Sequence, residues 1–302
     1  MSTKKINVAI VGLGFGAEFI PIYQAHPDAH LMAVCQRSKA KLDVVADGFG
    51  VPKRYTDFDA LLRDPEIDAV HINTPIPDHA PQTIAALRAG KHVACTVPMA
   101  TTVDECRAIV NLCRETGLTY TMMETTVYAR EFLYVQELHR RGELGRLQFV
   151  QASHQQDMDG WPGYWDGLPP MHYATHCVGP CLALVGAPAE RGGCVGSGRI
   201  DERRARVYGS SFAIESCHIQ IRGSDVAARI VRSLFDTARQ YRESFDVYGS
   251  TMSFEWPLLA GEPPVLHRKG LPEPQIPSRV EVPDFADRLP HEIRRFTRQG
   301  VY

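Results

Sequence analysis

The sequence lacks the features that mark several classes of protein. It has no run of about 18 apolar residues, so it predicts no membrane-spanning helix. Lysine and arginine total 33 against 35 acidic residues, and a formal net charge of −2 offers no basic field to nucleic acid. The first five residues lead straight into a strand pattern, without the apolar core of a signal peptide. We therefore expect neither a nucleic-acid nor a membrane partner.

The eight cysteines include no C-x-x-C pair of the zinc-binding kind, and several fall within apolar segments as buried free thiols do. This usage predicts a reducing, cytoplasmic location and no structural metal. The cysteines are Cys35, Cys95, Cys106, Cys113, Cys177, Cys181, Cys194 and Cys217.

The chain has 302 residues, enough for two domains, and neither internal repeats nor low-complexity tracts. Apolar strands alternate with helical patterns over its first part, which predicts a doubly wound parallel sheet, a Rossmann domain, over residues 1–124. The predicted strands are 6–11, 31–35, 69–73, 92–95 and 118–123, and the predicted helices are 15–26 (kinked at Pro21), 38–48, 57–63, 77–89 and 102–115.

The pattern changes after residue 124 to longer segments of alternating polarity joined by short turns. Such segments predict an antiparallel or mixed open sheet with one solvated face, within an α+β domain over 125–302. The expected strands are 147–154, 213–222, 226–235, 241–249 and 251–256, the expected helices are 128–141 and 171–185, and the proline-rich 256–283 reads as extended loop.

A glycine turn follows the first predicted strand. Gly12 permits the tight turn, Gly14 lets the backbone approach a pyrophosphate, and Ala17 is small enough for a helix to pack closely on the strand. The N–H groups at a helix N-terminus favour phosphate. The turn, which also contains Phe15 and Gly16, therefore predicts a dinucleotide site.

Three motifs together resemble the glucose–fructose oxidoreductase/inositol dehydrogenase/MocA family. They are Gly12-Leu13-Gly14-Phe15-Gly16, then Asn73-Thr74-Pro75 with Pro77-Asp78-His79-Ala80, and Gly90-Lys91-His92-Val93. The resemblance covers the first domain closely and the second loosely. It implies an open-sheet domain that shapes the substrate site, and oxidation or reduction of a sugar or cyclitol alcohol with NAD or NADP. It also implies homo-oligomers, dimers or tetramers, and in a few members redox-assisted glycoside cleavage with a tightly held NAD.

The sequence departs from that family at two places. The family carries Glu-Lys-Pro, whose lysine assists proton transfer, where this chain has Thr96-Val97-Pro98. Valine can neither donate nor accept a proton. Family members also continue beyond the equivalent of residue 302 with another helical segment, so we expect the C-terminus to be truncated.

His172 and His176 are predicted to share one face of a helix, since they are four residues apart. By resemblance, His176 matches a family histidine near the nicotinamide and His172 replaces an acid. A neutral imidazole near pH 7 can accept the proton of a hydroxyl. Tyr173 is a further candidate acid. The alternatives are a buried helix face with hydrogen-bonded imidazoles, or zinc bound by the pair, for which no third ligand is evident.

Cofactor choice depends on the end of the second strand. Gln36 cannot repel a 2′-phosphate and Arg37 could bind one, so NADP is permitted; alternatively, Gln36 holds the ribose diol of NAD while Arg37 faces solvent. The other residues expected to border the cofactor are Asn73, Thr74, Pro75, His79, Thr96, Val97 and Pro98.

Residues 154–166 form the segment richest in polar and aromatic side chains. Aromatic faces and amide or carboxylate groups are what sugars require, so Trp161, Tyr164 and Trp165 are candidate platforms, with Gln156 and Asp157 as hydroxyl ligands. Packing on a neighbouring subunit is the alternative. Tyr128 is a further substrate candidate, whereas Glu124 and Arg130 fit ion pairing equally well.

Three hypotheses about function follow. The first is an NAD(P)-dependent oxidoreductase acting on a secondary hydroxyl, with histidine rather than lysine as the acid/base group. The second is a hydrolase or lyase that retains NAD and oxidises its substrate transiently. The third is a non-catalytic nucleotide-binding protein.

Overall fold

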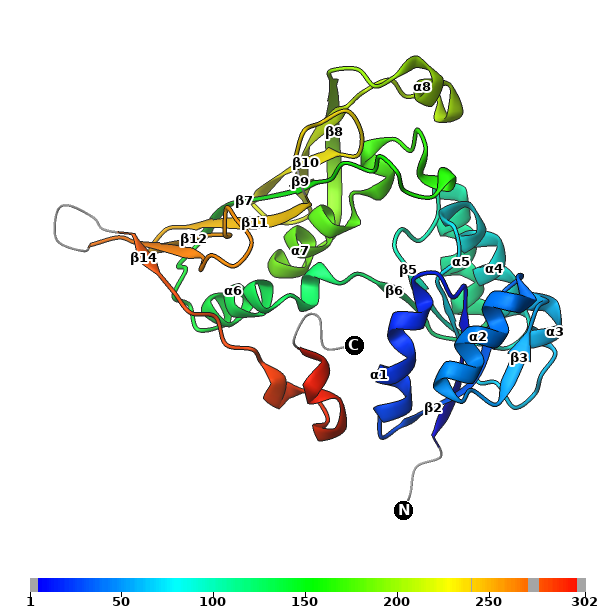
Figure 1. The fold of residues 1–302 in the computed structure, drawn as a ribbon. Helices are drawn as coiled ribbons and strands as arrows, with labels where there is room; N and C mark the ends of the chain where they lie inside the picture. Colours follow the sequence, from blue (N-terminus) through cyan, green and yellow to red (C-terminus); the bar gives the residue numbers. More distant parts are fainter. Residues whose placement is uncertain (1–4, 240, 271–276, 298–302) are drawn as a thin grey trace. The chain divides into compact units, whose positions relative to one another are not determined.

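The computed structural model describes residues 5–239, 241–270 and 277–297. Two compact units make up the chain (Figure 1). The first unit contains Met1–Met123 with Phe285–Tyr302, and the second contains Glu124–Asp284.

The first unit is built on a six-stranded parallel sheet with the strand order β3-β2-β1-β4-β5-β6. This is the order of a doubly wound dinucleotide-binding fold. The strands are β1 (Ile6–Val11), β2 (Ala29–Cys35), β3 (Lys53–Tyr55), β4 (Ala69–Ile72), β5 (His92–Thr96) and β6 (Tyr120–Met123).

Both faces of this sheet are covered. In β1, Ala9 and Val11 belong to one apolar cluster and Ile10 belongs to the other, because successive side chains of a strand point to opposite faces. The covering helices are η1 (Gly16–Phe19), α1 (Ile20–Ala25), α2 (Lys39–Phe49), α3 (Phe58–Leu62), α4 (Ile76–Arg88) and α5 (Val103–Thr116). Local signals set their ends: Thr102 and Glu105 form a capping box at the start of α5, and Gly117 ends it in a left-handed conformation.

The second unit contains an eight-stranded sheet with the order β14-β13-β12-β11-β7-β10-β9-β8. β10 pairs with β7 in parallel and the other pairs are antiparallel, so the sheet is mixed. The strands are β7 (Leu147–Gln155), β8 (Ala189–Ser197), β9 (Ile214–Ile221), β10 (Ala227–Ser233), β11 (Arg242–Gly249), β12 (Met252–Glu255), β13 (Val265–Arg268) and β14 (Ser278–Arg279).

Helices α6 (Arg130–Arg140) and α7 (Thr175–Val185) cover one face of this sheet (Figure 1). In β7, Val150, Ala152 and His154 are buried, and they alternate with Gln151 and Ser153, which line the opposite, open face. The shorter helices of this unit are η2 (Thr126–Tyr128), η3 (Gly163–Trp165), η4 (Pro170–Tyr173) and α8 (Glu202–Tyr208).

The structure corrects several sequence-based predictions in the elements themselves. Pro21 lies in the first turn of α1, where its missing N–H has no helical partner to lose, so it does not kink a longer helix. The predicted helix 171–185 is two elements, η4 and α7, separated at Ala174. Strands β13 and β14 lie within 256–283, which was predicted to be loop throughout, and residues 271–276 of that stretch lie outside the described residues.

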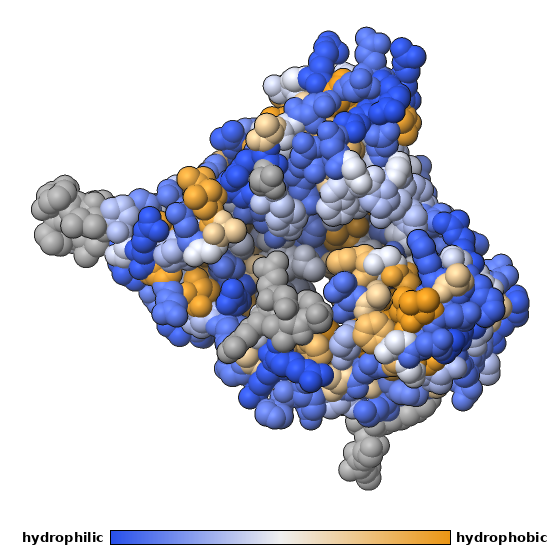
Figure 2. All heavy atoms as spheres, viewed as in Figure 1, coloured by the Kyte–Doolittle hydropathy of each residue, from blue (hydrophilic) through white to orange (hydrophobic). Residues whose placement is uncertain are grey.

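The C-terminal segment also differs from the predicted domain limits. Residues from Phe285 onward belong to the first unit, although they follow the second unit in the sequence. This segment contains the short helices η5 (Ala286–Arg288) and η6 (His291–Thr297), and η6 contacts α1 of the first unit. No described helix is long and apolar enough to cross a membrane. Hydrophilic residues cover most of the surface visible in Figure 2, with hydrophobic residues in smaller patches between them.

Candidate functional site

The glycine turn of the first unit is forced by close backbone contact. Gly12 has φ +86°, and a Cβ on it would lie 2.7 Å from the carbonyl oxygen of Asn73. A Cβ on Gly16 would lie 2.9 Å from Cγ2 of Ile10, so Gly16, rather than Ala17 alone, makes the closest approach to the strand. Gly14 differs from both, because a Cβ there meets nothing within 4 Å. Gly14 therefore faces open space that a ligand can fill.

A hollow of about 440 Å³ opens beside Gly14, at the carboxyl ends of β1 and β2. Ligands of open α/β sheets bind at this end of the strands. Val44 and Val45 give the hollow an apolar side suited to a nucleobase, and Gln36 and Lys41 add polar groups. The residues present therefore fit the adenosine half of a dinucleotide.

The predicted cofactor-specificity residues take different positions. Gln36 lines the hollow, while Arg37 is exposed and is not among its lining residues. Lys41, on α2, lines it instead, and sequence reasoning did not single it out. Neither Gln36 nor Lys41 carries a negative charge that would repel a 2′-phosphate.

Two loops of the first unit are joined by His79. Its side chain is 1% exposed; Nδ1 lies 2.7 Å from the Pro98 carbonyl and Nε2 lies 2.8 Å from the Thr74 carbonyl. Both ring nitrogens therefore have partners within the protein. His79 holds the loops after β4 and β5, which contain the predicted Pro75 and Val97.

The other predicted cofactor residues lie around the same two strand ends. The Asn73 backbone N–H donates to the Val11 carbonyl at 2.7 Å, which fixes the β4 end beside the glycine turn. The Thr74 hydroxyl donates to Gln82, and the Thr96 hydroxyl donates to the Ile72 carbonyl. Phe15 is 60% exposed at the turn.

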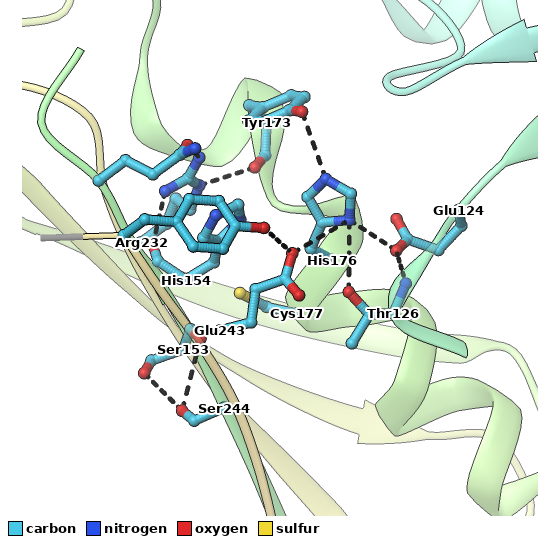
Figure 3. A network of polar contacts seen from close by, with 12 residues as sticks. Glu124, Thr126, Ser153, His154, Tyr173, His176, Cys177, Arg232, Glu243 and Ser244 are labelled. Carbon is cyan, nitrogen blue, oxygen red and sulfur yellow. Dashed lines mark hydrogen bonds and ion pairs between the residues drawn. The ribbon is translucent and has the colours of Figure 1, made fainter. Parts of the chain in front are cut away.

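The second unit contains a buried cluster of titratable groups around His176 (Figure 3). His176, on α7, is 7% exposed, and its Nδ1 lies 2.7 Å from Oε1 of Glu124. Burial disfavours a charged Glu124, but the hydrogen bonds and charge of His176 and the Thr126 N–H together hold its pKa below the ordinary value. An ionised carboxylate can only accept a hydrogen bond, so Nδ1 of His176 carries the proton and donates it.

This tautomer leaves the lone pair on Nε2 of His176, on the opposite side of the ring. The Tyr173 hydroxyl lies 3.3 Å from Nε2 and can donate to it. Tyr173, His176 and Glu124 therefore form a continuous chain of hydrogen bonds in which each proton has an acceptor beside it (Figure 3).

A second carboxylate also faces the ring. Glu243, on β11, has Oε1 3.9 Å from Nδ1 of His176 and accepts a hydrogen bond from the Tyr241 hydroxyl at 2.5 Å. An imidazolium at His176 would thus lie between two carboxylates. A positive charge is stabilised by opposite charges at such distances.

His154 and Arg232 complete the cluster. His154, on β7, is 1% exposed, and its ring lies 5.0 Å from that of His176. Burial, and then the charges of Arg232 and His176, lower its pKa well below the ordinary value, so it is neutral. Arg232, on β10, is fully buried and donates to backbone carbonyls and to Gln156.

The ligand atoms of His154, His176 and Glu243 lie within 4.8 Å of one another, which raises the question of a metal ion. Nδ1 of His176 is already engaged by Glu124, and the Arg232 cation is close enough to act on His154. The arrangement fits proton transfer better than metal binding.

His172 does not join the cluster. It lies in η4, its side chain is exposed, and its ring faces Tyr208 at 6.3 Å. The prediction that His172 and His176 share a helix face is wrong, because the 3-10 turn and the break at Ala174 replace the regular 3.6-residue repeat.

The aromatic segment 156–166 is anchored within the second unit. Arg204, on α8, binds Asp159 and Asp166 and lies over the Phe235 ring. Trp161 and Tyr164 are 51% and 38% exposed, and both contact the ring of Trp165, which is buried and in turn contacts Tyr173.

Gln156 and Asp157, the candidate ligands of substrate hydroxyls, already accept hydrogen bonds within the protein. Gln156 is buried and its Oε1 accepts from Arg232 at 2.6 Å, so that oxygen is not free for a substrate hydroxyl. Asp157 is exposed and its Oδ1 accepts from the Asp159 N–H. Tyr128 is 74% exposed on η2.

Comparison with known proteins bears on this geometry. Residues 6–124 match a family model described as an oxidoreductase family with an NAD-binding Rossmann fold. The match covers most of the first unit and ends at Glu124, so the rest of the second unit lies outside the matched residues.

Individual proteins are similar to the chain over different lengths. A glycosyl hydrolase family 109 protein of Saccharopolyspora erythraea is 30% identical over 204 residues, which cover 60% of this chain and 44% of that relative. A dTDP-3,4-didehydro-2,6-dideoxy-alpha-D-glucose 3-reductase of Streptomyces violaceoruber is 28% identical over 94% of this chain and 79% of that protein. Levoglucosan dehydrogenase, solved with NADH and levoglucosan, superposes with a TM-score of 0.78 at 20% identity, over 92% of this chain and 80% of that one.

Sequence reasoning missed most of the groups that surround His176. Glu243, His154 and Arg232 lie on three strands of one sheet, and strand pairing alone brings them together. The one available signal was a polar residue at a position of β7 or β10 where the alternation predicts an apolar one, as at His154 and Arg232.

Proposed function

We propose that the chain is an NAD(P)-dependent oxidoreductase acting on a secondary hydroxyl of a sugar, cyclitol or glycoside. The observation that carries the proposal is the hydrogen-bonded chain Tyr173–His176–Glu124, buried within a unit that accompanies a dinucleotide-binding fold. When bound, the cofactor supplies the hydride acceptor or donor. This chain's own residues manage the proton.

The tautomer of His176, with its proton on Nδ1, determines the path of the substrate proton. In the oxidative direction, Tyr173 Oη takes the hydroxyl proton of the substrate and passes its own proton to Nε2 of His176. The resulting imidazolium is paired with Glu124 and faces Glu243, so the positive charge does not remain unpaired in a buried site. In the reductive direction the same protons return.

The glycine turn, the hollow beside Gly14 and the loops joined by His79 would hold the cofactor. Gln36 and Lys41 at the hollow are compatible with both NAD and NADP. Trp161 and Tyr164 would offer aromatic faces to a carbohydrate, with Trp165 and Tyr173 behind them. Gln156 would act by holding Arg232 rather than by contacting a hydroxyl.

A second candidate is redox-assisted cleavage of a glycoside with a retained cofactor. Two observations favour it: Val97, 8% exposed, stands where the resembling family has its lysine, and Tyr241–Glu243 adds a second proton-transfer pair near His176. Cleavage by elimination needs a base for a C–H proton and an acid for the leaving oxygen, one more proton transfer than simple oxidation. The relatives named as glycosyl hydrolase family 109 proteins agree with this candidate.

One experiment separates the candidates. The purified chain is analysed by mass spectrometry for a released nucleotide and then assayed on a panel of free sugars, cyclitols and aryl glycosides. Net change in nicotinamide absorbance with a free sugar or cyclitol supports the oxidoreductase. Release of the aryl group, with nucleotide retained and no net absorbance change, supports redox-assisted cleavage. Nucleotide binding without turnover on any substrate would contradict both.

We also propose that the chain self-associates through the open face of the second sheet, where Gln151, Ser153, Arg229, Arg242 and Asp246 line a polar hollow of about 220 Å³. Sedimentation of a dimer or tetramer would support this, and a monomer at high concentration would contradict it.

A further inference from the structure

Arg232 is a buried cation that has no acidic partner in the described part of the chain. Its side chain is 0% exposed, and among the residues described no carboxylate oxygen lies within 4.0 Å of its guanidinium. Neutral oxygens surround it instead: Nε donates to the Tyr173 carbonyl at 2.8 Å, Nη1 donates to the His154 and Ser233 carbonyls at 2.6 Å, and Nη2 donates to Gln156 Oε1 at 2.6 Å.

Burial lowers the pKa of Arg232 to about 10, so the side chain stays charged at neutral pH. An apolar side chain could fill the same space without the cost of removing a charge from water. These bonds engage four of the five N–H donors but do not neutralise the charge, which acts on nearby groups.

Tyr173 lies next to the Arg232 charge. The Arg232 guanidinium carbon lies 5.2 Å from the centre of the Tyr173 ring, while Nε holds the backbone carbonyl of the same residue. Burial raises the pKa of Tyr173 above its ordinary value; Arg232 opposes that rise, whereas Glu124, Glu243 and Tyr164 add to it. The other titratable groups that face Tyr173 are His154, His176 and Tyr241.

We propose that Arg232 is a positioning residue for Tyr173, fixing η4 through the Tyr173 carbonyl and supporting negative charge on the phenol oxygen during proton transfer. This inference rests on the proposed function, in which Tyr173 relays a proton to His176. As the phenol proton moves to Nε2 of His176, the O–H bond breaks and its electron pair stays on Oη until the substrate proton arrives. At that moment the imidazolium of His176 faces Oη, and Arg232 adds a second positive charge beside the same phenol ring.

The test compares three variants. Arg232→Gln removes the charge, Arg232→Lys keeps the charge without the planar fork, and Arg268→Gln, at an exposed position on β13 of the same sheet, is the matched control. Each is made with Tyr173 replaced by a fluorinated tyrosine, whose more acidic phenol titrates by ultraviolet absorbance and ¹⁹F NMR without substrate.

We expect Arg232→Gln to raise the pKa of the labelled phenol by at least about one unit and to lower kcat about 10- to 100-fold, with KM within threefold. In Arg232→Lys the phenol should titrate within about half a unit of the parent, while kcat falls about 5- to 20-fold. Arg268→Gln should change neither. The fluorinated tyrosine should restore part of the kcat lost in Arg232→Gln, which a purely structural role for Arg232 does not predict.

An unchanged phenol titration in Arg232→Gln would overturn the proposal. If Arg232→Gln does not fold, an Arg232→Lys variant with the kcat of the parent would overturn it as well. If Tyr173→Phe is fully active but the phenol pKa still depends on Arg232, the proposed function fails while the influence of Arg232 on Tyr173 stands.

Discussion

Replacement of Glu124 by glutamine tests the buried dyad directly. The change removes the charge that faces Nδ1 of His176 at 2.7 Å but keeps a carbonyl oxygen that can still accept from the Thr126 N–H. The variant should therefore fold, because the local backbone bond survives and the amide has nearly the shape of the carboxylate.

The expected loss follows from the interaction that disappears. A hydrogen bond to a charged group contributes about 1.5–3 kcal/mol. If Glu124 stabilises the imidazolium by that amount in the transition state, and each 1.36 kcal/mol is tenfold in rate, kcat should fall about 10- to 150-fold. Oε1 of Glu243 lies 3.9 Å from Nδ1 of His176, so a second carboxylate still faces the imidazolium and limits the loss in kcat.

The assay is kcat and KM on the best substrate of the panel, with the melting temperature as the measure of folding. Glu202→Gln is the matched control, because Glu202 lies on α8 with its side chain 90% exposed. A folded Glu124→Gln variant with kcat within threefold of the parent would refute the role of the dyad.

Three further predictions follow from individual residues. His176→Ala should lower turnover at least about 100-fold with nucleotide binding preserved, whereas His172→Ala, exposed and apart from the cluster, should stay within about threefold in the same assay; the reverse order would refute the assignment. Gly14→Val should weaken nucleotide binding with little change in melting temperature, whereas Gly12→Ala should lower the melting temperature because its Cβ meets backbone at 2.7 Å; calorimetry and titration separate the two, and equal effects would contradict the distinction. His71 is fully buried, which lowers its pKa from 6.5 to about 4, so the unfolded chain binds its proton first as the pH falls. The free energy of unfolding should drop by about 3 kcal/mol from pH 6.5 to pH 4 in urea titrations, and His71→Gln should remove that part of the pH dependence; an equal pH dependence in the variant would show that other groups cause it.

Much of the fold followed from local pattern. The strands of the first unit are apolar because both of their faces are covered. The glycines and capping residues that limit the neighbouring helices can be recognised in the sequence itself. The long strands β7, β9, β10 and β11 alternate because only one face meets helices, and their predicted limits agree with the structure within about two residues. These features depend on neighbours close in sequence.

The wrong predictions concern segments whose local sequence pattern is compatible with more than one structure. A spacing of four residues suggested one helix for His172 and His176, but the turn of η4 sends the two imidazoles to different surroundings. Short strands such as β13 carry too few residues to show alternation among prolines. The return of the C-terminal segment to the first unit is a tertiary contact between η6 and α1.

The sequence by itself determined that a glycine turn would end a buried strand, and that His176 would lie beside apolar residues of a helix in a second domain. Only the tertiary structure decided what surrounds that imidazole. Glu124, His154, Arg232 and Glu243 are separated by up to 119 positions. The β7–β10 and β7–β11 pairings bring His154, Arg232 and Glu243 together, and α7 packs on these strands with His176 beside Glu124. An acid/base site depends on distances of a few ångströms between charges, and such distances arise from long-range pairing that no local pattern encodes.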